Sequence, residues 1–210
     1  MTIRRPGRAA LAASGALVAV AAVCGRAAGQ ELQVDRGAEN VVRFISRASI
    51  EEFEGVTDRI DGYILLDAPT LSADTGGEGT DVYLEVDLGS LDTGIGLRNR
   101  HMRDNYLEVG KYPFASFRAR IESTEPGPGQ TYRVSARGTL SIHGVERERL
   151  LTCRVEPRGV GYRARCEFEV LLSDHDIEIP KIMFLKLANE IRLELDFSVI
   201  PATARNGDAP

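Results

Sequence analysis

The sequence predicts an all-β fold in which about eight antiparallel strands close into a barrel, with a short helical insertion near residues 96–107. Three observations support this prediction. Apolar and polar residues alternate with a period of two in several segments, as in strands with one buried face and one solvent-exposed face. Turn-forming glycines and prolines separate these segments. An open sheet of so many strands would leave unpaired edges, and closure into a barrel removes them.

The chain starts with a segment typical of a secretory signal peptide. Residues 1–8 are positively charged, and residues 9–24 form an uncharged apolar run, shorter than the roughly 20 residues of a membrane-spanning helix. Ala27 and Gly29 are small residues two positions apart, which suits cleavage after Gly29. We therefore expect residues 1–29 to be a signal peptide and the mature protein to be secreted, in the periplasm. Lipid attachment at Cys24 and an uncleaved N-terminal anchor remain alternatives.

The predicted barrel domain spans residues 30–199. Weak strand signals at 40–46 and 55–66 precede five stronger alternating segments, whose apolar positions are Val82, Leu84, Val86 and Leu88; Ala115, Phe117, Ala119 and Ile121; Val134, Ala136, Gly138, Leu140 and Ile142; Cys166, Phe168, Val170 and Leu172; and Ile191, Leu193, Leu195, Phe197 and Val199. Apolar residues in 96–107 recur every three to five positions, which favours helical turns. Residues 200–210 are predicted to be a disordered tail, because 201–210 hold no aliphatic residue larger than alanine.

Two cysteines remain after the predicted cleavage. Cys153 and Cys166 lie in segments that read as two strands, 150–155 and 162–172, joined by a turn-rich stretch. Both cysteines are equidistant from the centre of that turn, so antiparallel pairing would place them opposite each other. We predict a cross-strand disulfide, in agreement with an oxidising compartment, and two buried free thiols are the alternative. Neither a CxxC pair nor a nearby histidine completes a metal site.

The inward-facing positions of the predicted barrel are almost wholly apolar, so any bound molecule should be lipid-like. A barrel of about eight strands is either filled by side chains or holds one small ligand, and alternation does not distinguish these cases. If the barrel is hollow, ten residues are predicted to line it: Phe44, Leu84, Val86, Leu88, Phe117, Leu140, Ile142, Phe168, Val170 and Phe197.

Charge argues against a nucleic-acid partner. The formal net charge is −5, and removal of residues 1–29 takes away four arginines and no acid, which leaves the mature chain at −9. Binding to phosphate backbones requires a clustered positive surface.

No catalytic or metal-binding pattern stands out. The chain has no GxSxG motif and no cysteine next to a histidine, so we predict no enzymatic activity and no cofactor apart from a bound lipid. His101, His143 and His175 lack metal-ligand spacing, so no metal site is predicted, and each is expected to be a packed or surface residue. The stretch Asp174, His175, Asp176 is expected to form a solvated loop.

The densest basic cluster is formed by Arg98, Arg100, His101 and Arg103. It has two interpretations. The arginines would either form a charged rim at the barrel mouth that meets a polar head group, or hold the insertion against the barrel by salt bridges to the acids at positions 92, 104 and 108.

Two stretches resemble a known family. Residues 90–117 read SLDTGIGLRNRHMRDNYLEVGKYPFASF and residues 138–145 read GTLSIHGV. In order and spacing they resemble the YceI-like family of secreted lipid- or polyisoprenoid-binding proteins. The resemblance implies an extended, lipocalin-like barrel with a helical insertion and a tunnel suited to a long isoprenoid chain. It assigns structural roles to the turn residues Thr93, Gly94 and Gly144 and to the strand entry at Tyr112 and Pro113, and no lipid contact to any motif residue.

Together these features predict a secreted β-barrel that holds or carries an amphiphile, a polyisoprenoid or isoprenoid quinone, by removing its apolar chain from water. The alternative is a ligand-free barrel that acts as an interaction module for a membrane or redox partner.

Overall fold

The computed structural model describes residues 29–47, 52–179, 181–182, 185–186 and 188–205, so residues 1–28 of the predicted signal peptide and residues 206–210 of the predicted tail lie outside it. The strands are β1 (Gln30–Val34), β2 (Val41–Arg47), β3 (Glu52–Thr57), β4 (Ile60–Leu66), β5 (Asp81–Asp87), β6 (Phe114–Pro126), β7 (Tyr132–Ile142), β8 (Val145–Arg158), β9 (Gly161–Leu171), β10 (Lys181–Ile182), β11 (Leu185–Lys186) and β12 (Glu190–Pro201). The helical segments are η1 (Leu88–Ser90), α1 (Gly96–His101), the π-helical turn η2 (Met102–Tyr106), η3 (Leu172–His175) and α2 (Ala202–Arg205).

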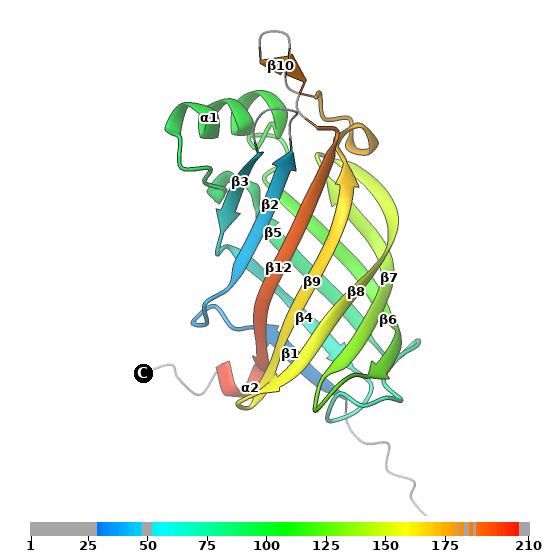
Figure 1. Cartoon of the computed structure of the whole chain (residues 1–210). Helices are drawn as coiled ribbons and strands as arrows, with labels where there is room; N and C mark the ends of the chain where they lie inside the picture. The colour runs from blue at the N-terminus through cyan, green and yellow to red at the C-terminus, as the bar shows by residue number, and fades with distance from the viewer. Residues whose placement is uncertain (1–28, 48–51, 180, 183–184, 187, 206–210) are drawn as a thin grey trace, which may run out of the picture.

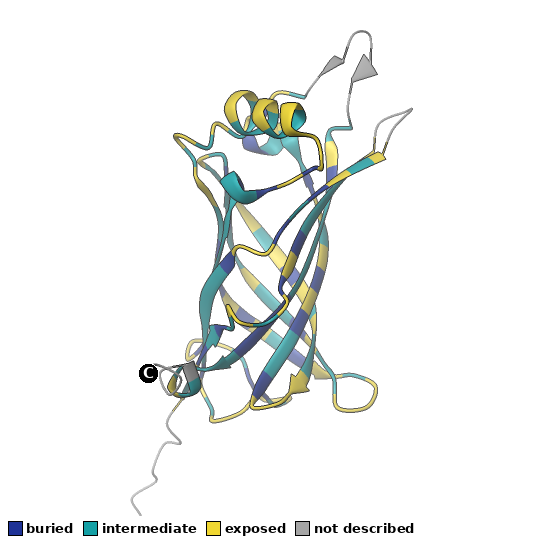
Figure 2. Cartoon of the chain, turned by 90° about the vertical axis from the view of Figure 1, so that its left-hand side faces the viewer, coloured by how far each residue is buried: buried dark blue, intermediate teal, exposed yellow. Residues whose placement is uncertain are grey.

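Eight antiparallel strands of the described chain form a closed barrel (Figure 1). The order around the ring is β1, β4, β5, β6, β7, β8, β9 and β12, and β12 pairs back with β1. Strands β2 and β3 extend the sheet from the same edge of β12 as β1, opposite β9, because β2 pairs with residues 191–196 of β12 and β1 with residues 199–201. Burial alternates along the strands, as the period of two in the sequence requires (Figure 2). The predicted antiparallel barrel is confirmed.

Two features near the start of the domain differ from the prediction. Strand β1 was not predicted, although it closes the ring by pairing with both β4 and β12. The single strand predicted at 55–66 is two strands, because the chain turns at residues 58 and 59. There the backbone N–H of Arg59 donates to Thr57 Oγ1 at 2.9 Å. Strand β3 therefore pairs with β2, whereas β4 pairs with β1 and β5.

The helical insertion lies between β5 and β6 and covers one end of the barrel (Figure 1). Two backbone hydrogen bonds of 2.9 Å join Asp92 to Val56 in β3. The Asp92 carboxylate also accepts hydrogen bonds from the Gly94 N–H at 2.8 Å and from Asn99 Nδ2 at 2.7 Å. Thr93 donates to Asn99 Oδ1 through its N–H and its hydroxyl. These contacts confirm the predicted insertion and attach it to the barrel.

The loop between β4 and β5 lies at the opposite end of the barrel. Its Leu71 is buried in the hydrophobic core, and the N–H of Leu71 donates to the Tyr162 hydroxyl at 3.0 Å. Thr80 is also buried, and its hydroxyl accepts a hydrogen bond from the Ile121 N–H. The loop is therefore part of the folded domain and packs across this end of the barrel.

The last strand extends beyond the predicted boundary at Val199. Strand β12 continues to Pro201, which lies opposite Leu32 of β1, and the short helix α2 follows. The pairing with β1 explains the extra ordered residues. Within the described residues, no helix has the length and apolar character needed to span a membrane.

The predicted disulfide is confirmed. Cys153 of β8 lies opposite Cys166 of β9 in the register, and the two sulfurs are bonded. The Cα atoms are 4.3 Å apart, a separation typical of directly opposed residues in an antiparallel pair.

We expect the Cys153→Ala, Cys166→Ala double variant to remain folded but to lose about 3 kcal/mol of unfolding free energy. The bond closes a loop with a sequence separation of 13, and loss of this constraint increases the entropy of the unfolded chain. Urea unfolding of the oxidised protein and the variant measures the difference. Equal unfolding midpoints would show that the backbone pairing of β8 with β9 is enough to hold this hairpin without the disulfide.

Candidate ligand-binding cavity

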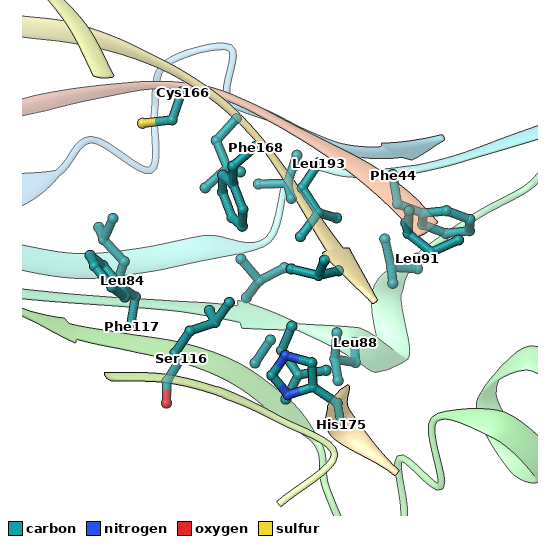
Figure 3. Close-up of a pocket in the computed structure, with 18 of the residues that line it drawn as sticks. Phe44, Leu84, Leu88, Leu91, Ser116, Phe117, Cys166, Phe168, His175 and Leu193 are labelled. Atoms are coloured by element: carbon teal, nitrogen blue, oxygen red, sulfur yellow. The ribbon is translucent and has the colours of Figure 1, made fainter. Parts of the chain in front are cut away.

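A cavity of about 570 Å³ occupies the interior of the barrel. This volume lies within the range of small-molecule sites in proteins. All ten residues predicted to line a hollow barrel lie in its wall: Phe44, Leu84, Val86, Leu88, Phe117, Leu140, Ile142, Phe168, Val170 and Phe197. Figure 3 labels Phe44, Leu84, Leu88, Phe117 and Phe168 among them. Their contact with a ligand stays a prediction.

Strand β12 shows why the interior is hollow rather than filled. Ile191, Leu193, Leu195 and Phe197 share the inward face, since side chains alternate along a strand. Ile191 and Phe197 are buried, whereas Leu193 and Leu195 between them are only partly buried. All four line the cavity, so the remaining exposed surface of the two leucines faces its interior. The alternation in the sequence does not distinguish a hollow barrel from a filled one, and the structure selects the hollow one.

Small residues make room in the wall. Ala115 on β6, Ala136 on β7 and Ala164 on β9 all line the cavity. Each lies on the apolar face of a strand, next to larger inward residues, so an alanine leaves more free volume in the lumen than a larger side chain would, without exposing polar groups. Alternation identifies these positions as inward-facing, but their effect on volume depends on what lies across the barrel.

The insertion supplies the rim of the cavity at one end. Its residues Ile95, Leu97, Met102 and Tyr106 are among those that line the space. Ile95 and Leu97 are 53% and 62% exposed, so apolar surface continues from the lumen to the outside at this end. The barrel mouth therefore lies beneath α1 and η2.

The predicted arginine cluster is dispersed in the structure. Arg98 lies in the cavity wall, where its guanidinium contacts the Phe53 ring at 4.6 Å and donates to the hydroxyl and carbonyl of Thr93. Arg103 donates to the Leu91 carbonyl at 2.6 Å, and Arg100 is exposed. Of the three, only Arg98 is positioned to meet a ligand at the mouth.

The charged and polar groups of the insertion stabilise the turn that starts at Asp92. Hydrogen bonds from Asn99 and from the Gly94 N–H lower the pKa of Asp92, and the positive charge of Arg103 adds to this effect. Glu108, one of the acids expected to bind the arginines, instead lies 2.8 Å from His143 Nε2.

Two buried polar side chains in the cavity wall were missed by the sequence reasoning. Ser46 on β2 and His175 at the end of η3 are each 1% exposed. The solvated loop expected around His175 is wrong for this residue, because η3 folds back against β8 and the His175 Nδ1 lies 3.1 Å from the Val145 carbonyl oxygen. A histidine in a polar stretch gives no sequence signal for such burial.

The described residues contain no group of three or more His, Cys, Asp or Glu side chains arranged to hold a metal ion. His101 is exposed at the mouth, and His143 lies in the hairpin between β7 and β8.

Comparison with known proteins agrees with this architecture. The family model of the YceI-like domain matches residues 32–199. This chain belongs to the YceI-like family. No curated protein sequence matches it.

Several solved structures share the fold at low sequence identity. Burkholderia cenocepacia BcnA superposes with a TM-score of 0.63 and 17% identity, over 79% of this chain and 98% of BcnA. A polyisoprenoid-binding domain from Saccharophagus degradans, implicated in plant cell wall breakdown, superposes with a TM-score of 0.59 and 17% identity. The match covers 81% of this chain and 98% of that domain. The Campylobacter jejuni YCEI protein superposes with a TM-score of 0.50 and 16% identity, over 69% of this chain and 82% of the YCEI protein.

The YceI-like motif residues hold the structure around the mouth. His143 and Gly144 have φ values of 53° and 75° and form the two-residue turn between β7 and β8. The Tyr112 ring packs edge-on against the His143 ring, with centroids 4.7 Å apart. His143 Nδ1 lies 3.1 Å from the His175 carbonyl oxygen, so the motif turn anchors η3.

His175→Gln is expected to reduce the loss of stability of this YceI-like barrel as the pH falls from about 7 to 5. Burial lowers the pKa of His175 and is the largest effect. The hydrogen bond to the Val145 carbonyl opposes it, the charges of Arg147 and Arg149 add to it, and Asp174 raises the pKa by the smallest amount. With a folded-state pKa below the unfolded value of about 6.5, the unfolded chain binds the proton first. Stability is therefore full above the unfolded pKa and falls as the pH decreases toward the folded pKa. Denaturant unfolding of both proteins across this range measures the effect, and parallel stability profiles would contradict it.

Proposed function

We propose that this protein binds the apolar chain of an amphiphile, a polyisoprenoid or an isoprenoid quinone, in the barrel cavity and holds or carries it outside the cytoplasm. The observation that supports the proposal most directly is the cavity itself, whose wall consists almost wholly of aliphatic and aromatic side chains. The polyisoprenoid-binding domain from Saccharophagus degradans shares this fold, which agrees with such a ligand.

The affinity would come from removal of the chain from water, worth about 0.8 kcal/mol for each buried methylene. The strands present the wall before any ligand arrives, so little conformational entropy is lost on binding. Among the described residues that line the cavity there is no acid and no lysine, and the polar contacts are confined to a few positions. We therefore propose non-covalent binding rather than catalysis.

The compartment is part of the same proposal. The Cys153–Cys166 disulfide supports an oxidising environment. The signal peptide predicted at residues 1–29 would deliver the chain to the periplasm. N-terminal sequencing of the exported protein checks this, and a start near Gln30 is expected.

Native mass spectrometry of protein purified from its own periplasm tests the function, with extraction and identification of any bound lipid. A co-purifying prenyl lipid that rebinds to the delipidated protein is the expected result. A ligand-free protein that takes up no added prenyl lipid would overturn the proposal and favour an interaction module for a membrane or redox partner.

A further inference from the structure

The His175 imidazole is the largest buried polar side chain in the wall of the mainly apolar cavity. It is 1% exposed, and it enters the cavity wall from η3, directly after the end of β9 (Figure 3). Its position is held from two sides. The Val145 carbonyl binds the ring, and His143 binds the backbone carbonyl of His175.

The hydrogen bond at Nδ1 decides where the ring carries its proton. A backbone carbonyl oxygen only accepts hydrogen bonds, so Nδ1, 3.1 Å from the Val145 oxygen, is the protonated donor. Burial lowers the pKa of His175, which favours the neutral ring with a single N–H. The remaining nitrogen, Nε2, therefore presents a lone pair and no hydrogen.

Nε2 is buried and has no hydrogen-bond partner among the described residues. An unpaired buried acceptor is unfavourable in a folded protein, so its persistence at a cavity wall points to a partner supplied by a ligand. The Ser46 hydroxyl is also buried and without a partner in the described part of the chain, and it lines the same cavity. Ser46 pairs with Ile191, which pairs with Val170 near the end of β9, so Ser46 and η3 lie at the same end of the barrel.

The two groups differ in what they recognise. A hydroxyl such as that of Ser46 either donates or accepts, so it does not distinguish a carbonyl from an alcohol. Neutral His175 with its proton on Nδ1 only accepts at Nε2. A ligand carbonyl or ether oxygen has no hydrogen to donate, so it would leave the lone pair of Nε2 unpaired. A ligand hydroxyl would donate a hydrogen bond to that lone pair.

We propose that His175 Nε2 accepts a hydrogen bond from a hydroxyl group of the ligand, so that the cavity selects prenyl lipids with a hydroxyl donor over equivalents that lack one. This inference rests on the proposed function and narrows its ligand class to hydroxyl-bearing prenyl chains, either prenols or the reduced, quinol form of prenyl quinones.

The test compares ligands that differ only in the donor. Delipidated mature protein is titrated with geranylgeraniol and with geranylgeranyl methyl ether, and separately with a short-chain prenyl quinol and its quinone under controlled redox conditions. One additional hydrogen bond predicts that each hydroxyl form binds about fivefold to tenfold more tightly than its partner. The first pair reports on alcohols and the second on quinols, which separates the two sources of the hydroxyl.

A variant and a spectroscopic readout locate the effect. His175→Phe keeps an aromatic ring but removes the acceptor, and is expected to bind alcohol and ether equally, whereas Ser46→Ala should retain the preference. In the wild-type protein, the ¹⁵N resonance of His175 Nε2 should shift with the alcohol and not with the ether, which tests the contact even if the variant does not fold.

The outcomes are distinguishable. Equal affinity of the wild-type protein for alcohol and ether would overturn the role of His175 and leave the lipid-binding function intact. If neither compound binds, the proposed function itself fails.

Discussion

Ala136→Phe is expected to reduce prenyl-lipid affinity more than a hundredfold while the barrel stays folded. Ala136 lies on the inward face of β7 and lines the cavity. A phenyl ring at this position would occupy the space of about four ligand methylenes, equivalent to about 3 kcal/mol of lost burial. Because the ring enters a void rather than a packed core, the stability should change by less than about 1.5 kcal/mol. Titration of the delipidated variant with geranylgeraniol measures the affinity.

The neighbouring Ser135 gives a matched control. It lies on the opposite face of the same strand, where its hydroxyl contacts that of Thr152 on β8 at 3.0 Å. Ser135→Phe introduces the same ring on the outside of the barrel, so lipid affinity should remain at the wild-type level. If both variants bind lipid as well as the wild-type protein does, the ligand does not occupy the barrel interior.

Gly138→Val is expected to destabilise the domain by roughly 4 kcal/mol, enough to prevent accumulation of folded protein. Gly138 pairs with Ala119 of β6, and a Cβ atom at this position would lie 2.0 Å from the Arg118 carbonyl oxygen and 2.4 Å from the Ala119 Cα atom. The β6 backbone cannot yield without breaking the ladder that closes this side of the barrel. The measurement is the urea midpoint, or the yield of folded protein after export.

Gly110→Val is the corresponding control. Gly110 is exposed, and a Cβ atom there would meet nothing within 4 Å. The unfolding free energy of the Gly110→Val variant should remain within about 0.5 kcal/mol of the wild-type value. Similar losses in the two variants would mean that close approach of β6 and β7 is not the reason for glycine at position 138.

The inward faces of the strands were predictable because side-chain direction alternates with each residue, a local property of extended backbone. For the same reason the pairing of Cys153 with Cys166 followed from their distances to one turn. Strand β1 was harder to predict, since it is only five residues long. Its role depends on β12, which joins the sheet from the far end of the chain.

The fate of the arginine cluster shows the limit of sequence proximity. Arg98 and Arg103 are five positions apart, yet only Arg98 lines the cavity, while Arg103 donates to the Leu91 carbonyl. Which of these side chains reaches the mouth depends on how α1 and η2 are attached to β3, and on no feature of the basic residues themselves.

By itself, the sequence determined which residues face inward, that these residues are apolar, and which cysteines meet, because each depends on backbone periodicity and short-range pairing. Only the tertiary structure decided that the barrel is hollow, since free volume is the difference between the space that eight strands enclose and the summed volume of side chains from all of them. It likewise decided that His175 is buried, with an Nε2 that has no partner among the residues the structure describes, because that environment is assembled from η3, β8 and the barrel wall, which are brought together only when the chain folds.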